Sequence, residues 1–203
     1  MDNLLIPIFP LNGVIFFPES NLPLNIFENR YLDMINFSLS TNKLIGMIQF
    51  DENNIPYKIG CVGKINQFKE LDNGNYLINL KGKNFFSIIK EISTLKKFRL
   101  AKVKIKNFKE KKTIINKITK YNRKILLKKY QKYVDKYNLQ IDINLISRTP
   151  DVDLIQFISM TCPFSTADKQ MLLEAFDLKS ITEKLIGLFD FYTSIKESGN
   201  ELN

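Results

Sequence analysis

The chain has 203 residues, of which 44% are hydrophobic and 12% aromatic, and its formal net charge is +9 at pH 7. This composition excludes a disordered chain, and the length suits one domain or two small ones. No apolar run reaches the roughly 18 residues that span a bilayer. Pro7 and Pro10 interrupt the apolar N-terminus. We therefore expect no membrane span and no signal peptide, and we expect a cytoplasmic protein.

Several residue types and motifs that enzymes use do not occur in this sequence, and their absence excludes some classes of function. The chain contains no histidine, and its only cysteines are Cys61 and Cys162. This excludes Ser-His-Asp and Cys-His catalytic groups and leaves no recognisable zinc site. No glycine-rich phosphate-binding loop occurs either. We predict a protein that is not an enzyme and that uses neither a metal nor a cofactor.

The N-terminal half is predicted to form mainly short strands. Apolar alternation and turn residues predict strands over 4–11, 22–27, 43–50, 59–68, 76–80, 85–92 and 98–105, with one helix over 28–39. Asn73 and Gly74 lie between two alternating runs, which is typical of a hairpin. Ala101, Val103 and Ile105 alternate with lysines, so one face of that strand should point inward. Many short strands in succession favour a barrel or a sandwich.

Near residue 110 the spacing of the apolar residues changes from that of a strand to that of a helix. Apolar residues recur every three or four positions as far as Tyr137, which predicts a long amphipathic helix with a cationic polar face. Thr149 and Pro150 predict the start of another helix, and Ser165 and Ser180 predict two more. The change of period places a boundary between a β subdomain over 1–108 and a helical bundle subdomain over 109–203.

Basic residues are concentrated in the middle of the chain. Residues 96–136 hold 17 basic and 2 acidic side chains, whereas residues 150–203 hold 4 basic and 9 acidic ones. The basic stretch can bind an anionic partner such as nucleic acid, lie against the acidic segment, or form a solvated face. The solvated face is the commonest of the three. The cations that share one helical face, and would grip such a partner, are Lys117, Lys120, Lys124 and Lys128.

Several short motifs occur in a fixed order along the chain. They are Leu-Ile-Pro-Ile-Phe-Pro-Leu (5–11), Pro-Leu-Asn-Ile-Phe-Glu-Asn-Arg-Tyr (23–31), Gly-Cys-Val-Gly (60–63), Leu-Lys-Gly-Lys-Asn-Phe-Phe-Ser-Ile (80–88), Arg-Leu-Ala-Lys-Val (99–103) and Asp-Lys-Gln-Met-Leu-Leu-Glu-Ala-Phe-Asp (168–177). Together they resemble the Lon protease N-terminal (substrate-binding) domain family. Two departures are Asn25, where a histidine is common, and Phe85, where an arginine is usual.

The resemblance implies a fold and a function. The implied class is α+β, with a PUA-like pseudo-β-barrel followed by a small C-terminal helical bundle. The implied function is non-catalytic binding of unfolded or extended polypeptide clients, in protein quality control or as an adaptor. Since the chain lacks the ATPase and protease modules, it looks like a stand-alone member of that family, and a separate protease is a further partner to be considered.

Aromatic residues near the N-terminus are the candidate client-binding site. The segment 12–18 is favoured because loops carry function more often than framework does. The site residues expected there and just beyond are Asn12, Phe16, Phe17 and Phe27. For each phenylalanine the alternative is an ordinary place in the core. The alternative function is RNA binding through the basic 96–136 stretch, which the scarcity of exposed aromatic residues on its helix disfavours.

Overall fold

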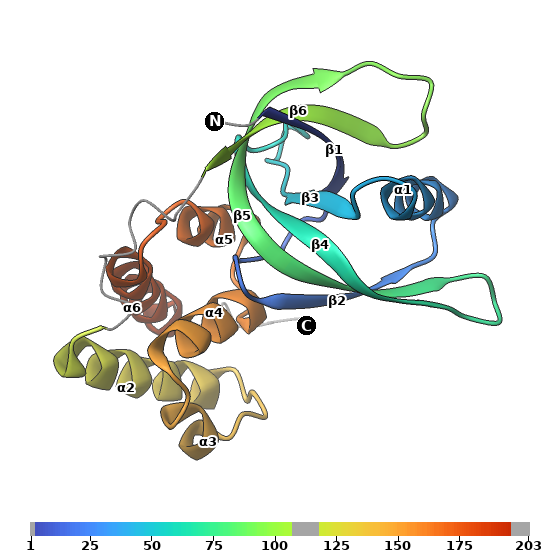
Figure 1. Ribbon diagram of the computed structural model, residues 1–203. Coiled ribbons are helices and arrows are strands. Elements are labelled where there is room, and N and C mark those ends of the chain that lie inside the picture. The colour runs from blue at the N-terminus through green and yellow to red at the C-terminus, as the bar shows by residue number, and fades with distance from the viewer. Residues whose placement is uncertain (1–2, 107–117, 196–203) are drawn as a thin grey trace, which may run out of the picture. The chain divides into compact units, whose positions relative to one another are not determined.

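The computed structural model describes residues 3–106 and 118–195, which pack into two compact units. The sheet unit comprises the described parts of 1–113 together with 160–174, and the helical unit comprises those of 114–159 and 175–203. Strands dominate the first unit and helices the second (Figure 1). The expected α+β class is confirmed.

Each unit has a short set of elements. The sheet unit holds β1 (Asn3–Pro10), β2 (Asn21–Ile26), α1 (Asn29–Leu39), β3 (Leu44–Ile48), β4 (Ile59–Glu70), β5 (Tyr76–Ile92), β6 (Arg99–Lys106) and α5 (Thr166–Leu173). The helical unit holds α2 (Lys120–Lys136), α3 (Ile143–Ser147), most of α4 (Asp151–Thr161) and α6 (Leu178–Ser194). The described part of the predicted long helix is α2, and its expected beginning near residue 110 lies outside the described residues.

The strands close into a ring. Their order is β2-β5-β4-β3-β1-β6, and β6 also pairs with β5, so that five strands form a barrel. The pair β1–β3 is parallel and the other pairs are antiparallel. Strand β2 lies outside this ring, because it pairs with β5 alone (Figure 1).

Strand β5 is longer than the sequence predicts. The pattern indicates two strands, over 76–80 and 85–92, whereas the structure has one strand of 17 residues. Gly82 and Asn84 are the turn-type residues between the two runs, and both continue the pairing with β4. The predicted hairpin before β5 is present, and Gly74 in its turn has a φ of +79°, a conformation that glycine adopts without strain. One half of β5 pairs with β2 and the other half with β6.

The barrel core follows from the alternation of apolar residues. One cluster of buried side chains comes from β1, β3, β4, β5, β6 and the residue Phe50; it consists of Ile6, Ile8, Ile48, Phe50, Val62, Phe86, Ala101 and Val103. On β6 the lysines at 102 and 104 point to solvent while Ala101 and Val103 are buried, as predicted. This cluster joins five strands through one apolar interior.

Helix α5 is bound to the barrel through buried polar side chains. Lys169 is 5% exposed, and its Nζ donates to the carbonyl oxygens of Gly13 (2.7 Å) and Met160 (3.2 Å). Gln170 donates through Nε2 to the Ile59 carbonyl oxygen (3.0 Å) and accepts from Gln49 Nε2 (3.1 Å). These bonds explain why 160–174 packs with the sheet, although a boundary at 108 assigns this segment to the helical subdomain.

Helix starts are partly as expected. Ser165 is the N-cap of α5, and its Oγ accepts from the Asp168 backbone N–H at 3.1 Å. The last helix begins earlier than the predicted Ser180, because Asp177 is its N-cap and accepts from the Ser180 backbone N–H at 2.9 Å. A carboxylate there satisfies an unpaired helix donor as well as a hydroxyl does.

The helical unit packs around aromatic residues. The rings of Tyr130 and Tyr133, on α2, lie 5.4 and 5.2 Å from the ring of Phe189 on α6. Arg123 of α2 pairs with Asp151 of α4 and donates to the carbonyl oxygens of Ser147 and Thr149. Over 3–106 and 118–195, no helix has the length and apolarity needed to cross a membrane.

Candidate functional site

Strand β2 forms an open edge of the sheet. Its residues Asn21–Ile26 pair with Tyr76–Lys81 of β5, and no other described strand pairs with it. Pro23 lies within this strand, which suits an edge because proline has no N–H to donate to a neighbour. An open edge is also a place where another chain can lie alongside a sheet.

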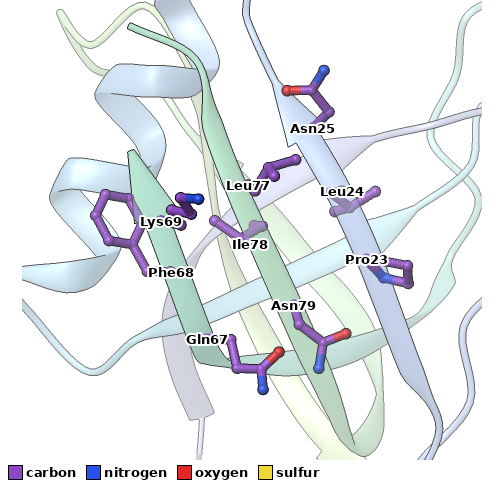
Figure 2. A pocket seen from close by; sticks show the side chains of 9 residues that line it. All are labelled: Pro23, Leu24, Asn25, Gln67, Phe68, Lys69, Leu77, Ile78 and Asn79. Carbon is purple, nitrogen blue, oxygen red and sulfur yellow. The ribbon is translucent and has the colours of Figure 1, made fainter. Parts of the chain in front are cut away.

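A hollow of about 490 Å³ lies on the outer face of the ribbon formed by β2, β5 and β4. Cross-strand pairing places its nine lining residues in three rows, which are Pro23–Asn79–Gln67, Leu24–Ile78–Phe68 and Asn25–Leu77–Lys69. The alternation of side chains along a strand puts the first and third rows on the same face. Figure 2 shows these side chains on three adjacent strands. We call this the outer hollow. Leu77 is 42% exposed there, so the hollow combines apolar patches on Pro23 and Leu77 with amide groups.

A second hollow, of about 290 Å³, borders the same strand. It is lined by the end of β1, by β2 and by the start of α1; its residues are Phe9, Pro10, Leu11, Leu24, Asn25, Ile26, Phe27, Glu28, Arg30 and Tyr31. We call it the Phe27 hollow, because the Phe27 side chain is 65% exposed. Both hollows include Leu24 and Asn25, so they meet at β2.

Charged groups border the Phe27 hollow. Arg30 pairs with Glu28 at 2.8 Å, and its guanidinium lies 4.6 Å from the centre of the Tyr31 ring. Burial raises the pKa of the Tyr31 hydroxyl, and the neighbouring Arg30 partly opposes this shift. Tyr31 therefore stays neutral at physiological pH. This ion pair leaves the hollow with no net charge from Glu28 and Arg30.

The expected loop residues have other positions. Phe16 and Phe17 are 1% and 2% exposed, so their rings are in the core and do not line an open surface. Asn12 accepts from the Phe50 backbone N–H through Oδ1 at 2.7 Å, and Gly13 donates to Gln49 Oε1 at 3.1 Å. The loop is therefore fastened to the end of β3. Of the four residues expected to contact a client, Phe27 alone is both apolar and open to solvent.

The expected cationic face lies in the helical unit. Lys120, Lys124 and Lys128 are exposed on α2, four residues apart, whereas Lys117 lies outside the described residues. The two groups of predicted site residues thus belong to different units.

Sequence reasoning overlooked the residues of the outer hollow. Pro23 within a predicted strand was a usable signal, because proline inside a sheet indicates an edge. The alternation over 76–80 also places Leu77 on the face opposite to the buried Ile78 and Leu80. Neither signal reveals that β4, β5 and β2 form the same face, since that depends on pairing between distant residues.

Within residues 3–106 and 118–195, no three side chains among histidine, cysteine, aspartate and glutamate gather to hold a metal ion. Cys61 and Cys162 are buried, and burial raises the pKa of the Cys162 thiol to about 12, so this thiol stays protonated. The chemistry on offer at β2 is apolar contact together with amide hydrogen bonding.

Known proteins resemble this chain over almost its whole length. It is 25% identical over 204 residues to the Lon protease of Dictyoglomus thermophilum, which covers 98% of this chain and 26% of that protein. It is 23% identical to the Lon protease of Bacillus thuringiensis, over 91% of this chain and 24% of that protein. The chain therefore spans about a quarter of the length of these relatives.

Solved structures share the fold. The crystal structure of a Lon N-terminal domain protein from Xanthomonas campestris matches 91% of this chain and 98% of its own, with a TM-score of 0.66 and 18% identity. The N-terminal domain of the Mycobacterium avium complex Lon protease matches 94% and 98%, with a TM-score of 0.63 and 16% identity. The family model of the ATP-dependent protease La (LON) substrate-binding domain matches residues 5–190. The chain therefore belongs to the LON substrate-binding domain family.

Proposed function

We propose that this chain binds unfolded or extended polypeptide segments, and that the surface beside β2 receives them. The family is named for substrate binding, and the relatives are named as proteases. The observation that carries the location is the open edge of β2 together with two hollows that share its residues Leu24 and Asn25. An extended chain lying along such an edge can place alternate side chains in neighbouring hollows.

Side-chain contacts supply most of the binding in this proposal. Pro23 has no backbone donor, which interrupts any hydrogen-bond ladder with an added strand. Leu77 and Phe27 expose apolar area that a client's apolar side chain covers, and the amides of Asn25 and Asn79 can bond its backbone. Such a surface accepts many sequences, because neither apolar contact nor backbone bonding selects a particular residue.

The proposal extends to the fate of the bound segment. A module that recognises segments without cutting them acts by presenting them, and we propose that a protease supplied by another domain or another protein receives them. The relatives support this. Each of them is named as a protease, and the segment that matches this chain makes up only about a quarter of its length.

The test measures affinity for a client that cannot fold. Fluorescence anisotropy with a labelled, reduced and carboxymethylated protein gives the dissociation constant for the native chain. Replacing Phe27 or Leu77 by serine removes exposed apolar contact, so each variant should bind about tenfold more weakly. Leu95→Ser is the matched control, because Leu95 is fully exposed and lines neither hollow.

The result can contradict the proposal in two ways. Absence of binding at micromolar concentrations by the native chain would refute the function. An equal loss of affinity in Leu95→Ser and in Leu77→Ser would refute the location, because it would indicate unspecific apolar contact. Circular dichroism of each variant establishes that a change in affinity does not come from unfolding.

A further inference from the structure

Helix α2 carries many more positive charges than negative ones. Its 17 residues include seven basic side chains and a single acidic one, Asp135. Asp135 accepts a hydrogen bond from Gln131, at 2.6 Å, so its contact is with a neutral residue. The helical unit must either neutralise these cations with acids from its other helices or present them to solvent.

Three of the seven cations are satisfied inside the unit. Arg123 pairs with Asp151 of α4, and Lys129 pairs with Asp190 of α6. Lys136 donates to the carbonyl oxygen of Tyr192, at 2.9 Å. The acidic C-terminal helices thus do screen one flank of α2, in line with one of the three interpretations of the basic stretch.

The other four cations form a row that this screening does not reach. Lys120, Lys124, Lys128 and Lys132 are exposed, and among the described residues none of them has an ion pair or a side-chain hydrogen bond. They occur at intervals of four residues, so they lie along one stripe of the helix over about 18 Å. The stripe is fixed in direction, because the opposite face is buried through Leu126, Tyr130 and Tyr133.

An exposed aromatic ring lies on the same stripe. Tyr121 is 74% exposed, and it precedes Lys124 by three residues and Lys128 by seven, which places it beside them. The helical spacing places the tyrosines of the predicted helix on its apolar stripe, and Tyr130 and Tyr133 are buried there. Tyr121 is exposed instead, and Tyr137 is 37% exposed. The ring of Tyr121 therefore contributes little to the core of the helical unit.

We propose that this stripe, Lys120, Tyr121, Lys124, Lys128 and Lys132, binds single-stranded nucleic acid. A row of evenly spaced cations complements the regular negative charge of a phosphate backbone. An exposed aromatic ring beside the row provides a surface on which one base can stack. An acidic polypeptide would use the lysines but would have no need of the ring, and this difference selects the nucleic acid.

Binding of fluorescein-labelled U20 RNA and dT20 DNA to the full chain tests this proposal by anisotropy over a salt series. If all four lysines contact phosphates, the slope of log affinity against log salt should be about −3. The variant with all four lysines replaced by glutamine should lose about tenfold or more in affinity and most of this slope. Tyr121→Ala should weaken binding about tenfold, and Tyr121→Phe should not, because the ring is retained.

A matched variant controls for net charge. Replacing Lys58, Lys64, Lys90 and Lys102 by glutamine removes four exposed charges from the sheet unit and should leave the affinity unchanged. The proposal is overturned if U20 and dT20 do not bind at about 0.1 M salt, or if both quadruple variants lose the same affinity. It is also overturned if a poly-glutamate peptide or a duplex binds more tightly than U20 and Tyr121→Ala changes nothing.

Discussion

Two thiols in the sheet unit show how burial sets chemistry at the level of one residue. Cys61 and Cys162 are 1% and 2% exposed. Burial raises the pKa of the Cys61 thiol strongly, and it raises the pKa of Cys162 to about 12, with nearby Lys169 opposing the second shift. For Lys169 itself, burial lowers the pKa, since charging an ammonium without water is unfavourable. The two protonated thiols are therefore part of the packing and are poor nucleophiles.

The buried thiols predict a loss of stability at alkaline pH. The folded chain keeps the Cys61 proton, whereas the unfolded chain releases it above the ordinary pKa of 9.0. The unfolded state then binds fewer protons, so the free energy of unfolding falls as the pH rises through 9. Urea unfolding gives the free energy of unfolding at pH 8 and at pH 10. Between these two values it should fall by about 1 kcal/mol less for Cys61→Ala than for the native chain.

A neighbouring apolar residue supplies the control for this prediction. Val62→Ala creates a comparable small cavity without removing a titrating group, so its cost should be the same at pH 8 and pH 10. If Cys61→Ala and the native chain lose equal stability between these values, the thiol does not stay protonated in the folded state.

At the level of the element, strand β5 depends on one close approach. A Cβ added at Gly82 would lie 2.0 Å from the carbonyl oxygen of Phe17, which is backbone and cannot move as a side chain can. The Gly82 backbone N–H also donates to the Ser20 carbonyl oxygen at 2.9 Å. This contact allows β5 to run without a break past the turn before β2, and so to join the β2 edge to the barrel.

Gly82→Ala should destabilise the sheet unit. We expect a loss of about 1–3 kcal/mol in the free energy of unfolding, because the new methyl group forces β5 and the Phe17 turn apart. Gly187→Ala is the matched substitution in α6, where nothing lies within 4 Å of the added Cβ. It should stabilise by roughly 0.5–1 kcal/mol, since alanine is the better helix former. Denaturation monitored by circular dichroism compares them, and equal effects would contradict the close approach.

At the level of the whole molecule, the sheet unit is discontinuous in sequence. Residues 160–174 complete it, and Lys169 and Gln170 bond to its backbone at Gly13 and Ile59. A chain ending at the boundary that the sequence suggests, residue 108, leaves these carbonyl groups without their partners. Lost hydrogen bonds of this kind cost about 1–3 kcal/mol for each buried group.

Two fragments test this arrangement. Residues 1–113 joined to 160–177 through a flexible Gly/Ser linker should fold cooperatively, and residues 1–113 alone should melt at a lower temperature or fail to fold. Thermal melts of both fragments by circular dichroism give the answer. Equal melting temperatures would mean that α5 adds nothing to the stability of the sheet unit.

Several features could be predicted from the sequence because they depend on neighbouring residues. Alternation indicated the inward face of β6, Asn73 and Gly74 indicated the hairpin, and Ser165 indicated the start of α5. The ordered motifs identified the family over nearly the whole chain. The two runs of β5 were recognised as strands, but no local signal indicated that they form one strand.

Other features were decided by the tertiary structure alone. Phe16, Phe17 and Phe27 look alike in the sequence, yet the first two are buried and the third is open to solvent. The difference arises because β5 and the barrel cover one part of the chain and leave the edge of β2 uncovered. Periodicity is a local property that residues a few positions apart determine, whereas burial depends on which distant segments pack together. The class of the fold therefore follows from the sequence, and the position of the binding surface follows from the packing.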